Sequence, residues 1–307
     1  MLPRARCGSL NLIASYARLG WTEDIYLHTC IYYILVGQSQ TKTVFTVSRL
    51  HSVITDIMPT ALIFGGSGKV AQHLTRILVS NSYKVHSLIR SESQVQSLTS
   101  IGAQPIVQSV EDASVADLVS TLKSAKPDVV VWSAGAGGKG GPARTNAVDN
   151  EAAIKSFDAC AQAGIKRYIM VSAVDNRDRK NKPVPEWYND EDRARSDKSH
   201  AAIGAYYDAK LAADKDLVIK NGKRGLEYTI VRPGGLSMDP ATGKCAAGKI
   251  HITPTISRED VAQIIYECIK NDGTKGLAFD CVGGDEEIST AVARVAKDKV
   301  DTFSGYY

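Results

Sequence analysis

The sequence lacks any pairing of cysteines that would predict a zinc site or a disulfide framework. Its six cysteines are widely spaced and none belongs to a CxxC motif: Cys7, Cys30, Cys160, Cys245, Cys268 and Cys281. Closely spaced cysteine pairs are what zinc sites and small disulfide-rich folds require. The cysteine content is therefore typical of a reducing compartment, and we expect a cytoplasmic protein without a bound metal.

The sequence also lacks a long apolar run and a strong excess of one charge. The closest approach to a membrane span, residues 25–36, has about half of the roughly 20 residues that a spanning helix needs, and it contains His28 and Thr29. The 37 basic residues nearly balance the 33 acidic residues. Nucleic-acid and membrane-surface binders usually carry a clustered basic excess, so we expect neither kind of partner.

What is present is the composition of a globular protein, with 307 residues of which 44% are hydrophobic, enough for a sizeable core. Residues 1–57 differ from the rest, because the first 20 include Arg4, Arg6 and Arg18 and no acidic residue. They could be a non-native extension ahead of Met58, a transit segment that would direct the protein to mitochondria, or an ordered part of the fold. We expect a poorly ordered or non-native extension, followed by a single domain over residues 58–307.

Apolar runs that alternate with helical patterns begin at Thr60. The runs predict strands at 60–64, 83–90, 105–108, 128–133, 167–172, 227–231 and 277–282, and the patterns predict helices at 69–80, 146–163 and about 206–221. Strands that are repeatedly separated by helices indicate βαβ units. We therefore predict an α/β fold with a doubly wound parallel sheet (a Rossmann fold) and a small C-terminal extension on the substrate side.

A glycine-rich turn, Gly65-Gly66-Ser67-Gly68-Lys69-Val70-Ala71, directly follows the first predicted strand and opens the first predicted helix. Such a turn lets the backbone approach a pyrophosphate and directs N–H groups and the helix dipole toward its charge. The turn is not a P-loop, because that motif requires Ser or Thr after Gly-Lys, where this sequence has Val70. The position of the turn predicts nucleotide binding, with a purely structural turn as the alternative.

The second predicted strand ends at Ile89-Arg90-Ser91, without an acidic residue at its tip. NAD enzymes usually place Asp or Glu there to accept a hydrogen bond from the ribose 2′-hydroxyl group. An arginine can instead pair with a 2′-phosphate. Arg90 therefore favours NADP over NAD, unless it is simply a solvated surface arginine.

Tyr206 and Lys210 have the i, i+4 spacing that places both side chains on one face of a helix. A lysine ammonium beside a phenol favours the phenolate, and such a tyrosine can exchange a proton with a substrate oxygen during hydride transfer. Ser172 ends the fifth strand at the carboxyl edge of the sheet, where its hydroxyl could hydrogen-bond the reacting carbonyl. The alternative is a tyrosine packed on the core beside a lysine whose stem lies along apolar surface.

Together these segments resemble the short-chain dehydrogenase/reductase superfamily, in particular its atypical and extended NAD(P)-binding, epimerase/dehydratase-like members, which include small fungal proteins. The resemblance covers about Pro59 to Val282, on FGGSGKVA, VVVWSAGAGGKGG, AGIKRYIMVSA, YYDAK, YTIVRPGGL and ISREDVA. It implies a catalytic group formed by Ser172, Tyr206 and Lys210. It implies cofactor contacts from Gly65, Ser67, Gly68, Lys69, Val70, Arg90, Ser133, Ala134, Gly135, Pro233 and Gly234.

At one position the sequence departs from the family pattern, and at another the pattern does not identify a single residue. The third loop glycine is replaced by Ala71, which the family tolerates. The doubled tyrosine leaves open whether Tyr206 or Tyr207 faces the site.

Residues 174–204 and 235–260 are expected to be loops on the substrate side. The charged stretch from Asp175 to His200 carries Trp187 and Tyr188, which could close over a substrate or anchor the loop to the body. We expect His200 to be a surface residue and Met170 to be part of the core.

The leading hypothesis is an NADP-dependent oxidoreductase of a small carbonyl, hydroxyl or quinone-like substrate, with Tyr206 as the acid or base. An epimerase or dehydratase is a further alternative, which is less favoured because it would need a larger substrate domain than residues 235–307 provide. A non-catalytic NADP(H)-binding, redox-sensing regulator is the alternative from another class. We expect a small uncharged or weakly polar substrate, while the sequence leaves the oligomeric state open.

Overall fold

The computed structural model of the protein describes residues 58–307, so the expectations for residues 1–57 lie outside the described residues. Its main sheet has eight strands in the order β3-β2-β1-β4-β5-β6-β10-β8. They are β3 (Gln104–Val107), β2 (Lys84–Ile89), β1 (Thr60–Phe64), β4 (Val129–Trp132), β5 (Arg167–Val171), β6 (Glu227–Pro233), β10 (Leu277–Glu287) and β8 (Lys244–Ala247). Only β8 pairs antiparallel with its neighbour. The predicted doubly wound Rossmann sheet is confirmed.

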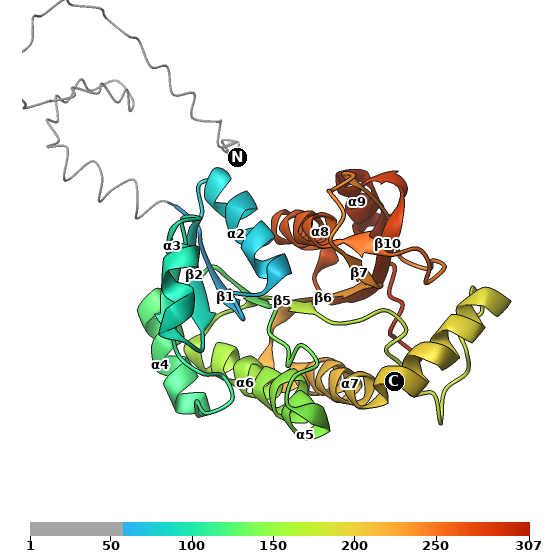
Figure 1. Cartoon of the computed structure of the whole chain (residues 1–307), viewed down its shortest axis with the longest axis horizontal. Coiled ribbons are helices and arrows are strands. Elements are labelled where there is room, and N and C mark those ends of the chain that lie inside the picture. Colours follow the sequence, from blue (N-terminus) through green and yellow to red (C-terminus); the bar gives the residue numbers. More distant parts are fainter. Residues whose placement is uncertain (1–57) are drawn as a thin grey trace, which may run out of the picture. The chain divides into compact units, whose positions relative to one another are not determined.

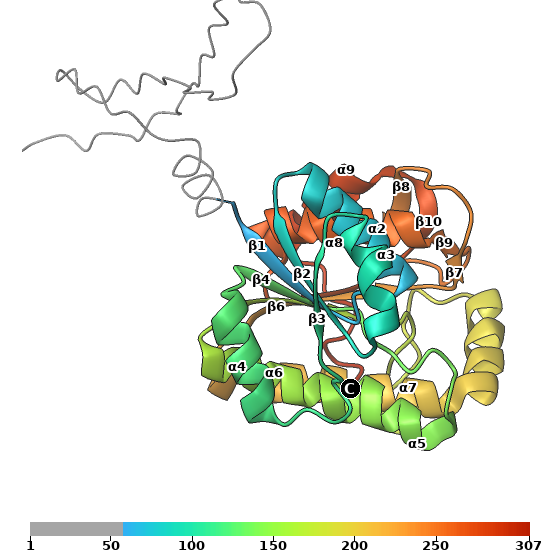
Figure 2. The same ribbon diagram turned by 60° about the vertical axis from the view of Figure 1, so that its left-hand side comes forward.

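Helices cover both faces of this sheet (Figures 1 and 2). One layer contains α2 (Lys69–Ser80), α8 (Arg258–Lys270) and α9 (Ile288–Asp298), and the other contains α4 (Val115–Ala125), α6 (Ala153–Ala163) and α7 (Asp190–Arg224). Strand β1 is buried on both faces. Ala61 and Ile63 belong to the apolar cluster beneath the first helix layer, and Leu62 and Phe64 belong to the cluster beneath the second. A strand buried on both faces must be apolar at every position.

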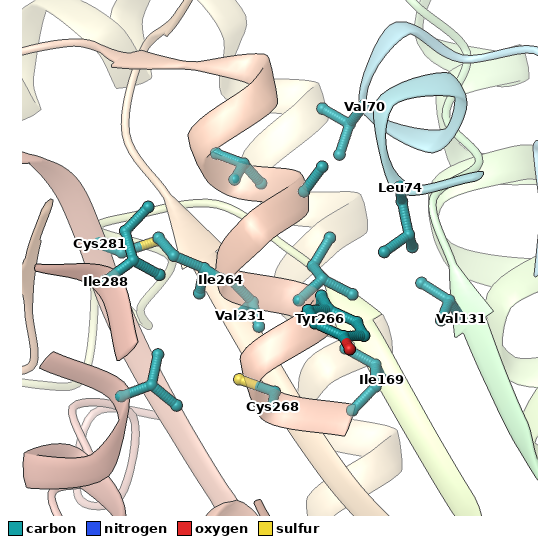
Figure 3. Packing of buried hydrophobic residues seen from close by; sticks show 14 of the residues in the cluster. Val70, Leu74, Val131, Ile169, Val231, Ile264, Tyr266, Cys268, Cys281 and Ile288 are labelled. Atoms are coloured by element: carbon teal, nitrogen blue, oxygen red, sulfur yellow. The ribbon is translucent and has the colours of Figure 1, made fainter. Parts of the chain in front are cut away.

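Figure 3 shows how the first layer packs on the sheet. Val70 and Leu74 of α2 meet the strand residue Val131 and the α8 residues Ile264 and Tyr266 in one buried cluster. This packing fixes α2, and with it the glycine turn before it, against the carboxyl end of β1. Met170 on β5 is fully buried in the other layer, as predicted.

The stretch predicted as a loop up to His200 is half helix, which corrects the sequence-based boundary. Helix α7 begins at Asp190, after a capping box in which Asn189 and Asp192 bond each other's backbone N–H groups. Its backbone breaks from helical angles at Ile203, where φ is −133° and ψ is 38°. The first part of α7 is exposed and charged, and it lacks the apolar periodicity that identified the second part.

Two further segments differ in detail from the predictions. The single helix expected over 146–163 is divided into a π-helical segment, η2 (Asn146–Ala152), and α6, with α5 (Gly141–Thr145) before them. The expected loop over 235–260 contains the short parallel pair β7 (Leu236–Ser237) and β9 (Ile256–Ser257), as well as β8. A short helix, α3 (Val95–Thr99), packs near β3. Within residues 58–307, no helix has the length and apolar character needed to cross a membrane.

Candidate active site

The turn between β1 and α2 passes directly against neighbouring backbone. Gly65 has a φ of +76°, and a Cβ atom there would lie 2.5 Å from the Cα of Ala134. At Gly66 a Cβ atom would lie 2.5 Å from the Cβ of Ser87 on β2. Both positions therefore require glycine, since any side chain would push the turn away from the sheet.

The N-terminus of α2 is suited to an anion. Its N-cap residue, Gly68, provides no side-chain cap, and its first turn contains no acidic residue. The amides of a first helical turn have no acceptor within the helix, and they carry the positive end of the helix dipole. A Cβ atom at Gly68 would lie 3.2 Å from the carbonyl oxygen of Gly65, so glycine also keeps this approach open. These features fit the pyrophosphate of a dinucleotide.

Arg90 lies beside this turn. It lines a cavity of about 180 Å³, here called the loop cavity, together with Gly65, Ser67, Gly68 and residues 133–135. Its Nη1 is 3.8 Å from Glu111, whose carboxylate also accepts two hydrogen bonds from Arg144, at 2.7 and 3.0 Å. Because Glu111 is engaged by Arg144, the exposed Arg90 guanidinium still has donors for a phosphate.

A larger cavity of about 830 Å³, the central cavity, runs from Gly68 along the carboxyl ends of β4, β5 and β6 to α7. A third cavity of about 360 Å³, the outer cavity, lies on the far side of Tyr206. Every site residue predicted from the sequence lines at least one of the three cavities. The residues shared by the central and outer cavities are Ser172, Ile203, Tyr206, Pro233, Leu236 and Arg258.

Tyr206, and not Tyr207, stands beside Lys210. The Lys210 Nζ atom is 5.9 Å from the centre of the Tyr206 ring, and Tyr206 borders both the central and the outer cavity. Tyr207 is buried and stacks on the ring of His200, with 3.9 Å between the ring centres. Tyr207 borders the outer cavity, whereas Tyr206 borders both cavities and stands beside the lysine, so the geometry of α7 favours Tyr206 as the residue that faces the site.

Lys210 is buried, and within residues 58–307 two partners hold its ammonium group, which leaves one of its three N–H donors for a ligand. Its Nζ atom donates to the carbonyl oxygen of Val171 at 3.1 Å and lies 3.2 Å from Oδ1 of Asp149 on η2. The other Asp149 oxygen accepts from the backbone N–H of Ala136 at 2.9 Å. Asp149 thus links the loop after β4 to the lysine, and it is a site residue that the sequence analysis missed.

The electrostatics of the pair differ from the expectation that the lysine would favour a phenolate. Burial raises the pKa of Tyr206, and the lowering effect of the Lys210 ammonium is smaller. Burial alone would lower the pKa of Lys210, but Tyr206, Asp149 and Asp214 together hold it above its ordinary value. The site therefore contains a charged lysine and a protonated tyrosine at neutral pH.

Ser172 was expected to hydrogen-bond a substrate carbonyl, but its hydroxyl group points to a buried carboxylate. It donates to Oδ2 of Asp214 at 2.5 Å, and the same oxygen accepts from the Asn176 side chain at 2.7 Å. Burial raises the pKa of Asp214, against the lowering effect of the Ser172 hydrogen bond. The Ser172 oxygen also accepts from the Asn176 amide at 3.3 Å. Its proton is therefore committed to Asp214, and its oxygen has one further lone pair for a substrate donor.

The segment around the start of α7 corrects the expectation for His200 and favours an anchoring role for Trp187 and Tyr188. His200 is half-buried rather than a surface residue, and its Nε2 atom is 3.1 Å from Asp175. Trp187 packs edge-on against Tyr306, and Tyr188 belongs to a small apolar cluster. Neither aromatic residue lines the central or the outer cavity, so both anchor the segment to the body of the domain.

The residues that sequence reasoning missed are the partners of the predicted ones. Asp214 lies one further helical turn beyond Tyr206 and Lys210, so the same i, i+4 spacing could have identified it. Asp149 and Asn176 carry no comparable signal. They reach the site because η2 and the loop after β5 pack there.

Comparisons with known proteins agree with this fold. A family model described as NAD(P)H-binding matches residues 65–272. A UPF0659 protein of Schizosaccharomyces pombe is 40% identical over 236 residues, which cover 77% of this chain and 94% of the relative. The uncharacterized sugar epimerase YhfK of Bacillus subtilis is 34% identical over 234 residues, 76% of this chain and 98% of the relative. A solved Bacillus halodurans structure of the NAD-dependent epimerase/dehydratase type has a TM-score of 0.64 at 31% identity, covering 77% of this chain and 99% of that one.

Proposed function

The chain belongs to the NAD(P)H-binding family, whose relatives are oxidoreductase- and epimerase-like proteins, and we propose that it is an NADP(H)-dependent oxidoreductase. Its substrate would be a small compound that carries a carbonyl or hydroxyl group. The observation that carries this proposal is the position of Tyr206, a protonated phenol beside a buried ammonium group, on the wall shared by the central and outer cavities.

The chain's own residues divide into those that hold the cofactor and those that move a proton. The turn at residues 65–68 and the first amides of α2 would bind the pyrophosphate, and Lys210 would hold the nicotinamide ribose. When bound, NADPH supplies a hydride from its nicotinamide ring. In the reductive direction, the Tyr206 hydroxyl group would give its proton to the substrate oxygen, and a proton from solvent would then restore the phenol.

Asp149 and Ser172 have supporting roles in this proposal. Asp149 keeps Lys210 charged and fixed by holding its ammonium group against the carbonyl oxygen of Val171. Ser172, bonded to Asp214, presents an acceptor oxygen to the substrate side. A substrate hydroxyl group can donate to that oxygen, which favours binding of the alcohol partner of the reaction.

The preference for NADP rests on Arg90. Its guanidinium group is exposed at the loop cavity, and its acidic neighbour Glu111 is held by Arg144. A planar guanidinium group can bind a 2′-phosphate through two parallel hydrogen bonds. We propose that NADPH therefore binds more tightly than NADH.

A non-catalytic NADP(H)-binding regulator is the second candidate function. One observation favours it, because the Ser172 proton is donated to Asp214 rather than left free for a substrate carbonyl. In that case the cofactor would bind without turnover.

The test is NADPH oxidation at 340 nm with a panel of small ketones, aldehydes and quinones, using Tyr206→Phe and Tyr207→Phe. Removing the Tyr206 hydroxyl group should lower kcat about 10²- to 10⁴-fold without changing NADPH affinity, because only the proton donor is lost. Tyr207→Phe is the matched control, and it should retain wild-type turnover. Equal activity of wild type and Tyr206→Phe would contradict the proposed role, and NADPH binding without turnover of any compound would favour the regulator.

A further inference from the structure

We propose that the outer cavity is an anion subsite, in which Arg195 and Arg258 bind a carboxylate or phosphate group of the substrate. This inference rests on the proposed function for its placement beside Tyr206, and it goes further by naming the substrate class. It replaces the expectation of an uncharged substrate. The two arginines come from different elements, Arg195 from the first part of α7 and Arg258 from the start of α8.

Arg195 is half-buried in the wall of the outer cavity. Among residues 58–307, no carboxylate oxygen lies within 4 Å of its guanidinium group, and that group makes no hydrogen bond there. Its Nη2 atom lies close to the backbone of Gly235, where a Cβ atom would be only 3.3 Å away. A guanidinium group that is partly desolvated and lacks an acidic partner is a strong donor for an incoming anion.

Arg258 lies at the junction of the central and outer cavities and is fixed by backbone contacts. Its Nη1 atom donates to the carbonyl oxygens of Leu236, at 3.1 Å, and Ser237, at 2.8 Å. Neither contact neutralises its charge, and within residues 58–307 it has no carboxylate within 4 Å. A guanidinium group has five donor hydrogens in total, so it retains several for a ligand.

The acidic residue that lines the same cavity does not cancel this charge. Asp175 receives a hydrogen bond from Arg177 at 2.9 Å and one from Ser196 at 2.5 Å, and it lies 3.1 Å from His200. Its carboxylate is therefore neutralised within its own buried cluster. The cavity keeps a net positive character from the two arginines.

The two arginines lie beside the proposed proton donor, Tyr206. Tyr206 and Arg258 line both the central and the outer cavity, while Arg195 lines the outer one. A substrate that placed its anionic group between the arginines would bring a neighbouring carbonyl group to the Tyr206 hydroxyl. The arginines would thereby determine substrate specificity without taking part in proton transfer.

The experiment uses the full chain saturated with NADP⁺ and three aryl ketones as probes: 4-acetylbenzoate, its methyl ester and 4-acetylphenyl phosphate. Binding is measured by calorimetry, and NADPH oxidation is measured with the same compounds. At least one anionic probe should bind about tenfold or more tightly than the ester. A preference for one anion over the other identifies carboxylate or phosphate as the natural group.

Arg195→Met should reduce binding of the preferred anion to that of the ester, and it should leave the affinity for the ester and for NADPH unchanged. Arg193→Met is the matched control, since it removes the same charge from an exposed position two residues away on the same helix. Arg258→Lys should weaken the anion while keeping a positive charge, because the lysine cannot form two parallel hydrogen bonds.

The inference is overturned if the ester binds as tightly as both anions, if neither anion binds, or if Arg193→Met weakens the anion as much as Arg195→Met. Loss of NADPH affinity in Arg195→Met would also overturn it, by assigning the arginine to the cofactor. Anion binding without NADPH oxidation would support the subsite and contradict the proposed oxidoreductase. NADPH oxidation with no preference for an anion would support the oxidoreductase and contradict the subsite.

Discussion

Lys210 determines the electrostatics at the scale of single residues. Its ammonium group is almost fully buried, between the carbonyl oxygen of Val171 and the carboxylate of Asp149. A buried lysine without such partners would lose its proton, because desolvation disfavours the charged form. Here three neighbours keep its pKa above the ordinary value, while burial keeps the pKa of Tyr206 above that of a free phenol. The tyrosine is thus prepared as a proton donor.

This arrangement predicts opposite pH profiles for the two directions of the reaction. Ketone reduction needs the protonated phenol, so its kcat/KM should stay level through neutral pH and fall only above about pH 10. Alcohol oxidation needs the phenolate, so its kcat/KM should rise as the pH increases from neutral toward about 10. Steady-state rates from about pH 6 to 10.5 with NADPH and NADP⁺ test both directions.

Lys210→Met provides the control for this prediction. The lysine lowers the pKa of Tyr206, so its removal should shift both profiles to higher pH. A reduction profile of the wild type that falls between about pH 6 and 8 would contradict the account, because it would require a phenol with a lowered pKa.

At the scale of elements, the first part of α7 positions Arg195 and the kink at Ile203. It is tied down by Asp192, a fully buried carboxylate. Asp192 completes the capping box with Asn189, accepts from the backbone N–H of Ile252 at 2.9 Å and lies 2.7 Å from Nδ1 of His251. One side chain therefore joins the start of α7 to the segment before β9.

Asp192→Ala should lower the free energy of unfolding by about 2 kcal/mol, because it removes the half of the capping box that accepts from the Asn189 N–H and leaves the buried Ile252 N–H without an acceptor. Asp190→Ala, an exposed change in the same helical turn, should cost less than about 0.5 kcal/mol. Urea denaturation of both variants measures the difference. Equal stabilities for the two variants would show that Asp192 does not anchor the helix.

Comparison of α7 with the first strand and helix shows which segments could be predicted from the sequence and which could not. The apolar run of β1, the glycines after it and the periodicity of α2 identified all three segments. Burial determines the two apolar patterns, and the close approach of the turn to its neighbours requires the glycines. The first part of α7 carries almost no apolar residues, so its pattern resembles that of a loop. The π-helical turn that places Asp149 has no sequence signal, since it depends on packing against α7.

At the scale of the whole molecule, the site lies where the strand order reverses, between β1 and β4. Ligands of open α/β sheets bind at this point, beyond the carboxyl ends of the strands. That rule predicted the position of Ser172 from the sequence, and the structure has Ser172 directly after β5. Ser133 and Pro233, which the resemblance implied, lie directly after β4 and at the end of β6. It could not show the three separate cavities or the charge in the outer one, which depend on how the segments after β5 and β6 fold over the edge.

The central claim is that the N-terminus of α2 binds the phosphates of NADPH. Gly68 has extended backbone angles (φ −63°, ψ 150°) that aspartate can adopt, and aspartate is a good N-cap residue. Gly68→Asp should therefore have a thermal midpoint close to that of Gly68→Ala, while it places a negative charge where the pyrophosphate binds. Gly68→Ala is the matched control, because it introduces the same Cβ contact without the charge.

The measurement is a titration of NADPH into the full chain, followed by calorimetry, for the wild type and these two variants. We predict micromolar binding to the wild type, a small loss of affinity in Gly68→Ala and a loss of about a hundredfold or more in Gly68→Asp, with a thermal midpoint close to that of Gly68→Ala. Binding of the wild type only above about 1 mM, or equal affinity of Gly68→Asp and wild type, would contradict the account.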